Sequence, residues 1–294
     1  DSKKKGTTKM LLKIDRKRAQ ILPALTSLDI PHDISNDELH DLVRYTPAGK
    51  PRDILGTSTK IKMNGKLDQL SKVMYASPGR EAGINLCPFA GACEAVCLGK
   101  TTGRLRMDQA RRSRILKAIW FHMFTDSFME RAVHEVKRHE KYAIKKGLQP
   151  SIRMNGSTDI FWERHGLPQA VPSVQFYDYT KAPEKSRRDR PSNYHLTFSL
   201  SEDPRSMRWA LEYMEAGANA AAVFRMNGSN KKADAIKATA DLINAGNWQG
   251  FPLVSGDDTD VRYFDPPAHW VALYAKGREA LNDSSGFVQV IGGE

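Results

Sequence analysis

Short apolar runs alternate with longer amphipathic segments over most of this 294-residue chain. Residues 105–124 and 125–147 carry apolar side chains three and four positions apart, which is the spacing of helices that bury one face. Residues 203–218 and 229–247 have the same character, and each ends at or near a glycine. Seven further runs have the length and composition of strands: 72–77, 151–155, 174–179, 194–200, 220–225, 251–255 and 270–275.

The order of these elements predicts the fold class. A strand, a helix and a second strand in succession require a crossover connection, so we expect the strands to be parallel. Such a repeating unit gives either a barrel or an open doubly wound sheet. We expect an α/β fold of the partial or complete (β/α) barrel type over residues 69–294, preceded by an extension over residues 1–68.

The extension differs in character from the rest. Its first twenty residues are rich in lysine and arginine and predict a basic arm, which is either solvated or lies on a partner. Ser35 and Glu38 have the spacing of a capping box, which predicts a short helix over residues 35–45. Glycine and proline then interrupt regular structure until the first strand.

Composition places the chain among globular proteins that carry an excess of positive charge. Hydrophobic residues make up 40% and charged residues 27%, and no apolar run approaches the roughly 18 residues that a membrane helix needs. We expect no membrane contact and, because no signal-peptide core is evident, a place in the cytoplasm, that of the host if the protein is phage-encoded. The formal charge of +11 favours anionic partners.

All three cysteines of the chain, Cys87, Cys93 and Cys97, stand in one short segment with the spacing C-x5-C-x3-C. An odd number of thiols cannot pair completely in disulfides, whereas three thiolates in a curled loop can converge on a metal group. An iron–sulfur cluster fits better than zinc, because structural zinc usually has four protein ligands in two pairs. Zinc and three simply buried thiols remain the alternatives.

A three-cysteine loop directly after the first strand of a strand–helix barrel resembles the radical S-adenosylmethionine superfamily. That resemblance implies a 4Fe–4S cluster on the three cysteines, with one open iron that chelates S-adenosylmethionine, and it implies a need for a reductant. The usual spacing in the superfamily is C-x3-C-x2-C with an aromatic residue before the last cysteine, where this chain has Val96. The segment from "NLCPFAGACEAVCLGKTTGR" through "RMNGSTDIFWE" also resembles an uncharacterised bacteriophage family of the gene product 88 type.

Ligands of parallel α/β folds lie at the carboxyl ends of the strands, so polar residues at those ends are candidates for cofactor binding. Each has a simpler alternative as a turn or cap residue. The candidates are Ser77, Arg153, Asn155, Ser157, Asp159, Asp178, Ser199, Arg225, Asn227 and Asp257.

A basic stretch follows the cysteines. "GKTTGR" is no phosphate-binding loop, because Glu94 stands where that motif requires glycine. The stretch offers a surface for a nucleic acid, together with the basic N-terminus, or a solvated helix face. It contains Lys100, Arg104, Arg106, Arg111, Arg112, Arg114 and Lys117. Two functions are therefore predicted: a radical S-adenosylmethionine-type enzyme of unknown substrate, or a nucleic-acid-binding or virion-associated protein with a structural cluster or zinc and no catalysis.

Overall fold

The computed structural model describes residues 2–101 and 103–292, with the side chains of residues 2–13, 101 and 104 outside the description. Nine strands in these residues form one mixed sheet, in the order β1-β2-β3-β4-β5-β6-β8-β7, and β9 pairs with β6. The strands are β1 Leu55–Gly56, β2 Gln69–Met74, β3 Gln149–Arg153, β4 Gln175–Thr180, β5 Tyr194–Ser199, β6 Asn219–Met226, β7 Leu253–Ser255, β8 Trp270–Tyr274 and β9 Val288–Ile291.

The sequence predicts seven of these strands, and all seven are confirmed within a few residues. Every described pair is parallel except β1 with β2, so the carboxyl ends of β2 to β8 lie along one edge of the sheet. The α/β prediction is confirmed. No described pairing joins β1 to β7, so the sheet is open, and the predicted barrel stays a prediction.

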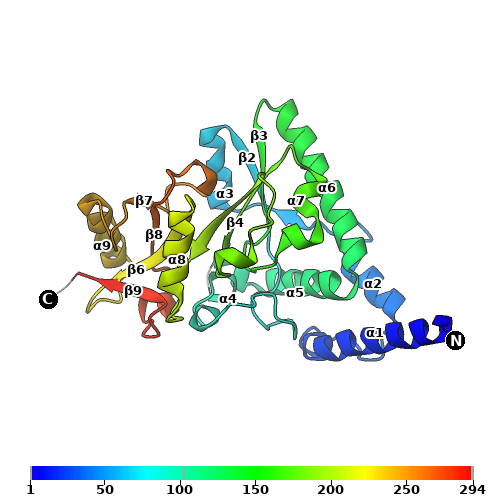
Figure 1. Cartoon of the computed structure of the whole chain (residues 1–294). Coiled ribbons are helices and arrows are strands. Elements are labelled where there is room, and N and C mark those ends of the chain that lie inside the picture. The colour runs from blue at the N-terminus through cyan, green and yellow to red at the C-terminus, as the bar shows by residue number, and fades with distance from the viewer. Residues whose placement is uncertain (1, 102, 293–294) are drawn as a thin grey trace.

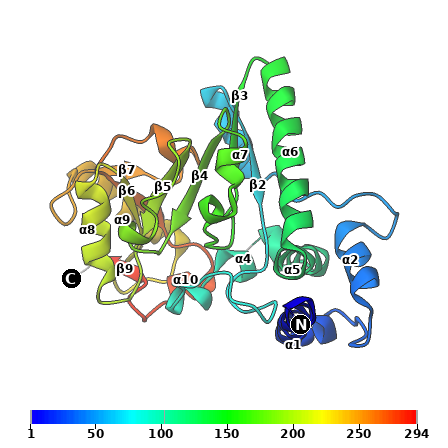
Figure 2. The ribbon, with the colours of Figure 1, turned by 45° about the vertical axis from the view of Figure 1, so that its right-hand side comes forward.

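The helices between the strands follow the amphipathic segments. Figures 1 and 2 show α6 along β3, and α8 and α9 against the β6 side of the sheet. The two helices predicted over residues 105–124 and 125–147 are both present, and the chain turns between them at Phe124, which is not helical. The helices are α1 Ser2–Ser27, α2 Asn36–Arg44, α3 Thr59–Met63, α4 Leu98–Thr101, α5 Asp108–Met123, α6 Thr125–Lys145, α7 Leu167–Ala170, α8 Ser206–Glu215, α9 Lys232–Ala245 and α10 Arg278–Leu281.

Short 3₁₀ helices occupy several of the connections. They are η1 Asn64–Leu67, η2 Ala92–Glu94, η3 Gly103–Arg106, η4 Trp162–His165, η5 Glu184–Ser186 and η6 Arg262–Phe264. None of the described helices is long and apolar enough to cross a membrane.

The two faces of the sheet differ in polarity. Successive strand residues point to opposite faces, and Ile152 and Phe176 belong to the main apolar core with Trp120, Phe128 and Trp162. The opposite face carries hydrogen-bonded polar side chains instead. Ser71 and Ser151 are 2.6 Å apart between their Oγ atoms, and Asn64 donates to Ser71 and to Tyr177, with Asp260 beside them. This second face is therefore a buried polar interior covered by α3 and the segment around Asp260.

The N-terminal extension is helical and contacts the rest of the chain. Helices α1 and α2 both contact α5, and Figure 2 shows α1 beside α5. Ile21, Leu25, Leu39 and Val43 are fully buried in the main core. The capping box of Ser35 and Glu38 is confirmed, since each side chain accepts the other residue's backbone N–H. The lysines of the predicted basic arm before residue 14 have side chains outside the description.

Candidate functional site

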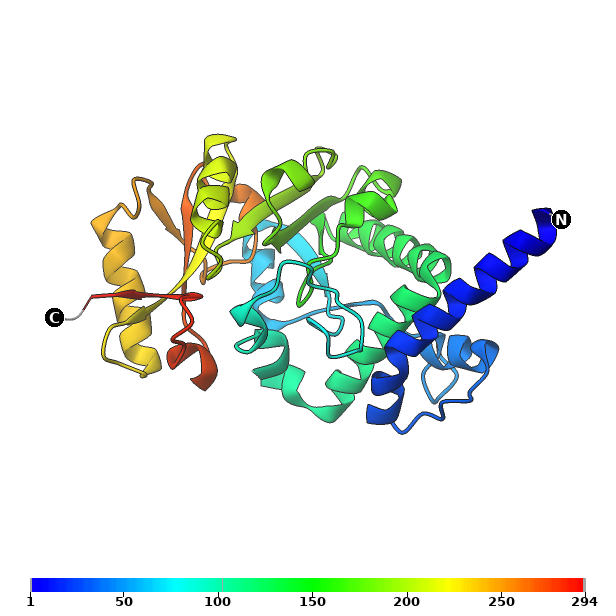
Figure 3. The same cartoon turned by 60° about the horizontal axis from the view of Figure 1, so that its bottom comes forward.

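The cysteine segment runs from the end of β2 to the start of α5, at the edge where the parallel strands have their carboxyl ends. In Figure 3 this segment, coloured cyan, lies in the middle of the molecule beneath the curved sheet. Cys87, Cys93 and Cys97 are half-buried cysteines, and none of the three belongs to a disulfide. All three line one cavity of about 160 Å³.

The rest of the cavity wall comes from three neighbouring strand ends. The structure thus brings together the cysteines and three of the predicted candidates, namely Ser157, Asp159 and Ser199. These come after β3 and at the end of β5, and the connection after β4 completes the wall. The remaining lining residues are Ala90, Leu98, Gly99, Gly156, Thr158, Tyr179, Thr180 and Lys181.

Backbone N–H groups act on all three sulfur atoms. Gly79 N donates to Cys87 Sγ over 3.3 Å, the backbone N–H of Gly91 acts to lower the pKa of Cys93, and those of Gly99 and Lys100 act to lower the pKa of Cys97. Such bonds favour thiolate over thiol. Burial outweighs them and raises the pKa of Cys87 to about 12 and the pKa values of Cys93 and Cys97 above the ordinary value. The three thiols are therefore protonated near neutral pH, and metal binding would have to displace their protons.

Glu202, just after β5, holds the cysteine segment in place. Its Oε1 accepts the backbone N–H of Ala92 over 2.6 Å. A Cβ atom on Gly91 would lie 1.8 Å from the same oxygen, so this close approach needs glycine. The other oxygen, Oε2, is buried and has no hydrogen-bond partner among the described residues. Glu202 is thus a clamp with one carboxylate oxygen left over.

Lys181 is a cation beside the thiols that the sequence analysis missed. Its Nζ donates to Ser199 O, Ser199 Oγ and Leu200 O over 2.9 to 3.2 Å and lies 4.6 Å from the ring centroid of Phe287. Burial lowers its pKa, while nearby Cys93 and Asp159 oppose the shift. Lys181 directly follows β4 but lies two residues beyond the predicted strand 174–179, so including the positions just after that strand among the candidates would have found it.

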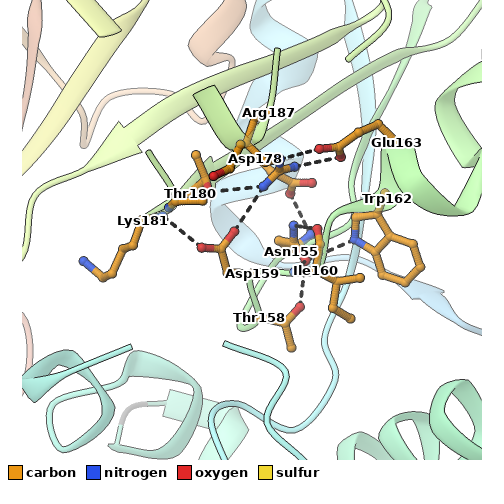
Figure 4. Close-up of polar contacts among 12 residues, drawn as sticks. Asn155, Thr158, Asp159, Ile160, Trp162, Glu163, Asp178, Thr180, Lys181 and Arg187 are labelled. Carbon is orange, nitrogen blue, oxygen red and sulfur yellow. Dashed lines mark hydrogen bonds and ion pairs between the residues drawn. The ribbon is translucent and has the colours of Figure 1, made fainter. Parts of the chain in front are cut away.

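The loop after β3 is shaped by Asn155, whose side chain is 3% exposed (Figure 4). Asn155 Oδ1 accepts hydrogen bonds from Thr158 Oγ1, Ile160 N and Trp162 Nε1 over 2.8 to 3.0 Å, and its Nδ2 donates to Ile160 O. Its backbone N–H donates to Asp178 Oδ1 over 2.6 Å. The predicted candidates Asn155 and Asp178 therefore build the loop, and neither lines the cysteine cavity.

A buried guanidinium connects this loop to the end of β4. Arg187 forms a two-bond ion pair with Glu163 and also donates to Asp159, Thr180 and Tyr194 (Figure 4). Asp159 accepts a second bond from Lys181 N over 2.9 Å. Burial raises the pKa of Asp159, and Arg187 counteracts part of that rise. Asp159 is thus fixed at the cavity wall from two sides.

Comparison with known proteins assigns a family. The sequence model of the family described as gene product 88 matches residues 50–291. The chain belongs to the gene product 88 family. This confirms the resemblance to an uncharacterised bacteriophage family, while no curated protein and no solved structure matches the chain. The matched region of this gene product 88 protein contains the whole cysteine cavity.

The other predicted candidates do not line the cysteine cavity. Each of them either bonds to another residue of the chain or is exposed to solvent. Ser77 donates to Glu81, and Arg153 donates to both oxygens of Asp260 over 3.0 Å. Arg225 donates to Asp283 O, while Asn227 is exposed. Asp257 pairs with Lys276 and accepts Tyr274 N. The expectation that polar residues at the carboxyl ends of strands bind a ligand therefore selected several residues that stabilise neighbouring loops instead.

Most of the basic stretch after the cysteines is likewise used internally. Arg114 and Lys117 are buried, Arg114 beside Glu81, and Lys117 donates to Ile54 O. Arg111 pairs with Glu81, Arg112 donates to Leu28 O, and Lys100 pairs with Glu94. The side chain of Arg104 lies outside the description, and Arg106 is exposed. Helix α5 thus offers few of its predicted cations to a nucleic acid.

Proposed function

We propose that Cys87, Cys93 and Cys97 bind a 4Fe–4S cluster with one open iron, and that the protein is a radical S-adenosylmethionine-type enzyme. The observation that carries the proposal is that all three cysteines line a single cavity and each has a backbone N–H group that favours its thiolate. Hydrogen bonds to the ligating sulfurs are a main means by which proteins stabilise and tune such clusters. Three merely buried thiols would need no such arrangement.

The placement of the three thiols favours a cluster over a single ion. Among residues 2–101 and 103–292, no three His, Cys, Asp or Glu side chains converge closely enough to hold one metal ion. A zinc ion draws its thiolates to within about 2.3 Å of one point, whereas a cluster spreads them over different irons.

Charged and polar residues surround the place that an open iron and its ligand would occupy. Lys181 would offset the negative charge of the thiolates, and Asp159 and Ser199 lie on the same wall. Tyr179 lines the cavity as well. A bound and reduced cluster would supply the electron that cleaves S-adenosylmethionine.

The order of the strands supports the enzyme type. From β2 to β6 each parallel strand lies beside the next in sequence, around a buried polar interior, and the cysteine segment directly follows β2. A partial (β/α) barrel with its cluster loop after the first parallel strand is the arrangement that the radical S-adenosylmethionine resemblance implies. The residues after β3 and β4 would then contact the cofactor.

Anaerobic reconstitution tests the cluster. We expect about four irons and four sulfides per chain, broad visible absorption and, after reduction, a paramagnetic resonance signal. Cys87→Ala, Cys93→Ala and Cys97→Ala should each lose most of the bound iron, whereas Met107→Ala, which removes an exposed side chain between the cysteines and α5, should keep it. Stoichiometric zinc without iron would refute the cluster.

Addition of S-adenosylmethionine then tests the enzyme type. The signal of the reduced cluster should change, and a cleavage product should form. An intact cluster that is indifferent to S-adenosylmethionine would refute the enzyme and indicate a structural cluster. Binding to a DNA oligonucleotide that weakens steeply with salt would then support the nucleic-acid-binding alternative.

A further inference from the structure

A second cavity, of about 410 Å³, adjoins the cysteine cavity. The two share Asp159, and the cysteine segment contributes to both, with Cys87 in the first cavity and Phe89 in the second. The second volume falls within the roughly 300–1,000 Å³ of small-molecule sites. Its wall also includes Phe121, Phe161, Arg164, His165 and Ser186.

Aromatic rings dominate the wall of this second cavity. The planes of Phe89 and Phe161 differ by only 2°, with their centroids 6.4 Å apart, and both side chains are half-buried. Phe121 meets the edge of His165 with centroids 5.0 Å apart. Phe161 already carries the guanidinium groups of Arg164 and Arg187 over its ring, so Phe89 is the aromatic surface that remains for a flat ligand to stack on.

One cation at this wall is available to a ligand. The guanidinium of Arg164 lies 4.5 Å from the centroid of Phe161, donates to Ser186 O over 3.0 Å, and belongs to an exposed side chain. Arg187 also lies over Phe161, but Glu163 and Asp159 neutralise its charge. Burial lowers the pKa of His165, so this imidazole adds hydrogen-bonding capacity rather than charge near pH 7. The available positive charge is therefore that of Arg164.

We infer that this second cavity binds a planar aromatic ring that bears an anionic group, with the ring on Phe89 and the anion on Arg164. Stacking on aromatic side chains and charge-assisted bonds from arginine are the usual means of recognising such ligands. A nucleotide and an aromatic carboxylic acid share this chemistry. The role of the ring as substrate rests on the proposed function, because Asp159 and the segment from Cys87 to Phe89 would place it next to the cluster.

Calorimetric titration of the cluster-free protein tests the binding itself. The probes are adenosine 5′-monophosphate and indole-3-acetate, which represent the two sources, together with adenosine and ribose 5-phosphate, which lack the anion and the ring respectively. At least one aromatic anion should bind at least tenfold more tightly than both truncated probes. Ribose 5-phosphate binding as tightly as the aromatic anions, or no binding of either aromatic anion, would overturn the inference.

Variants locate the binding. Arg164→Gln and Phe89→Leu should each weaken binding of the tighter probe about tenfold, since each removes one of the two recognition elements. Arg188→Gln is the matched control, because Arg188 is a 70% exposed arginine that pairs with Glu184 and does not line the cavity. Unchanged affinity in Arg164→Gln and Phe89→Leu, with wild-type circular dichroism, would place the ligand elsewhere and refute the inference.

The two proposals can fail separately. Arg164→Gln should take up iron like the wild-type protein, because Arg164 does not line the cysteine cavity. Ring binding without any iron binding would support the aromatic site and refute the cluster. Iron binding in a protein that binds neither aromatic anion would refute the aromatic site alone.

Discussion

Asp178 offers a sharp test of how the candidate site is built, because its carboxyl group is buried without a direct cationic partner. It is 1% exposed, and its two oxygens accept hydrogen bonds from Asn155 N and Tyr194 Oη over 2.6 and 2.8 Å. Burial raises the pKa of Asp178 to about 7, although these bonds and the more distant Arg153 and Arg187 oppose the rise. Asp178→Asn keeps the shape and removes the titration.

The size of the expected change in stability with pH follows from the difference in the pKa of Asp178 between the folded and unfolded states. The folded state holds the proton of Asp178 up to about pH 7, whereas the unfolded chain releases it near the ordinary value of 3.8. Between these pH values the folded state binds more protons, so this group makes stability fall as pH rises. Each pH unit is worth about 1.4 kcal/mol, so the wild-type protein should lose about 4 kcal/mol, relative to Asp178→Asn, between pH 4 and pH 8.

Urea unfolding followed by tryptophan fluorescence measures the difference. The free energy of unfolding of Asp178→Asn should exceed that of the wild-type protein by more at pH 8 than at pH 5. Asp41→Asn, on the exposed side of α2, controls for the loss of a carboxylate as such. A gap between Asp178→Asn and the wild-type protein that is the same at pH 5 and pH 8 would refute the assignment of a protonated Asp178.

Three further variants probe the cysteine segment, the loop after β3 and the helical layer. Glu202→Ala should lower iron uptake in reconstitution because the cysteine segment loses the hydrogen bond from Ala92 N to Glu202. Glu202→Gln keeps an acceptor oxygen and should retain uptake, so equal uptake in the two variants would contradict this role. Asn155→Ala should lower the free energy of unfolding, measured in urea, by about 3 kcal/mol because buried N–H groups lose their acceptor. As a control, Asn227→Ala at an exposed position should change the free energy of unfolding by less than about 0.5 kcal/mol. Burial lowers the pKa of Lys117 to about 8, so wild-type stability should gain up to about 3 kcal/mol from pH 8 to pH 10.5 as the unfolded state alone stays protonated. Lys117→Met should lack that gain in urea titrations, and an equal gain in the variant would assign it to other groups.

The strands and long helices could be predicted because their signal is local. A parallel strand buried on both sides needs a continuous apolar run, and runs such as 220–225 and 270–275 have little other use. Strands β1 and β9, by contrast, have two and four residues, and they exist only because β2 and β6 offer them hydrogen bonds. The sequences of β1 and β9 themselves carry no pattern that predicts such pairing.

The candidate site could be predicted only in part, for a physical reason. A polar residue at a strand end faces the ligand site or the loop packed beside it, and the sequence alone does not reveal which. Ser157 and Asp159 line the cysteine cavity, but Arg153 is drawn to Asp260, more than a hundred residues away in the chain. The basic stretch gave too large an expected nucleic-acid surface for the same reason, because the partners of Arg114 and Lys117 come from other segments of the chain.

The two cavities share the short segment from Cys87 to Phe89, which couples the two proposed ligands. Cluster assembly would fix Cys87 and thereby order Phe89, two residues further on, so part of the ordering cost of stacking a ring would already be met. Linkage then requires that the ring stabilise the cluster by the same factor by which the cluster tightens ring binding. We expect the tighter aromatic probe to bind the cluster-loaded protein several-fold more tightly than the cluster-free protein in calorimetry. Equal affinities would show that the segment is already rigid without its metal, and that the two cavities act independently.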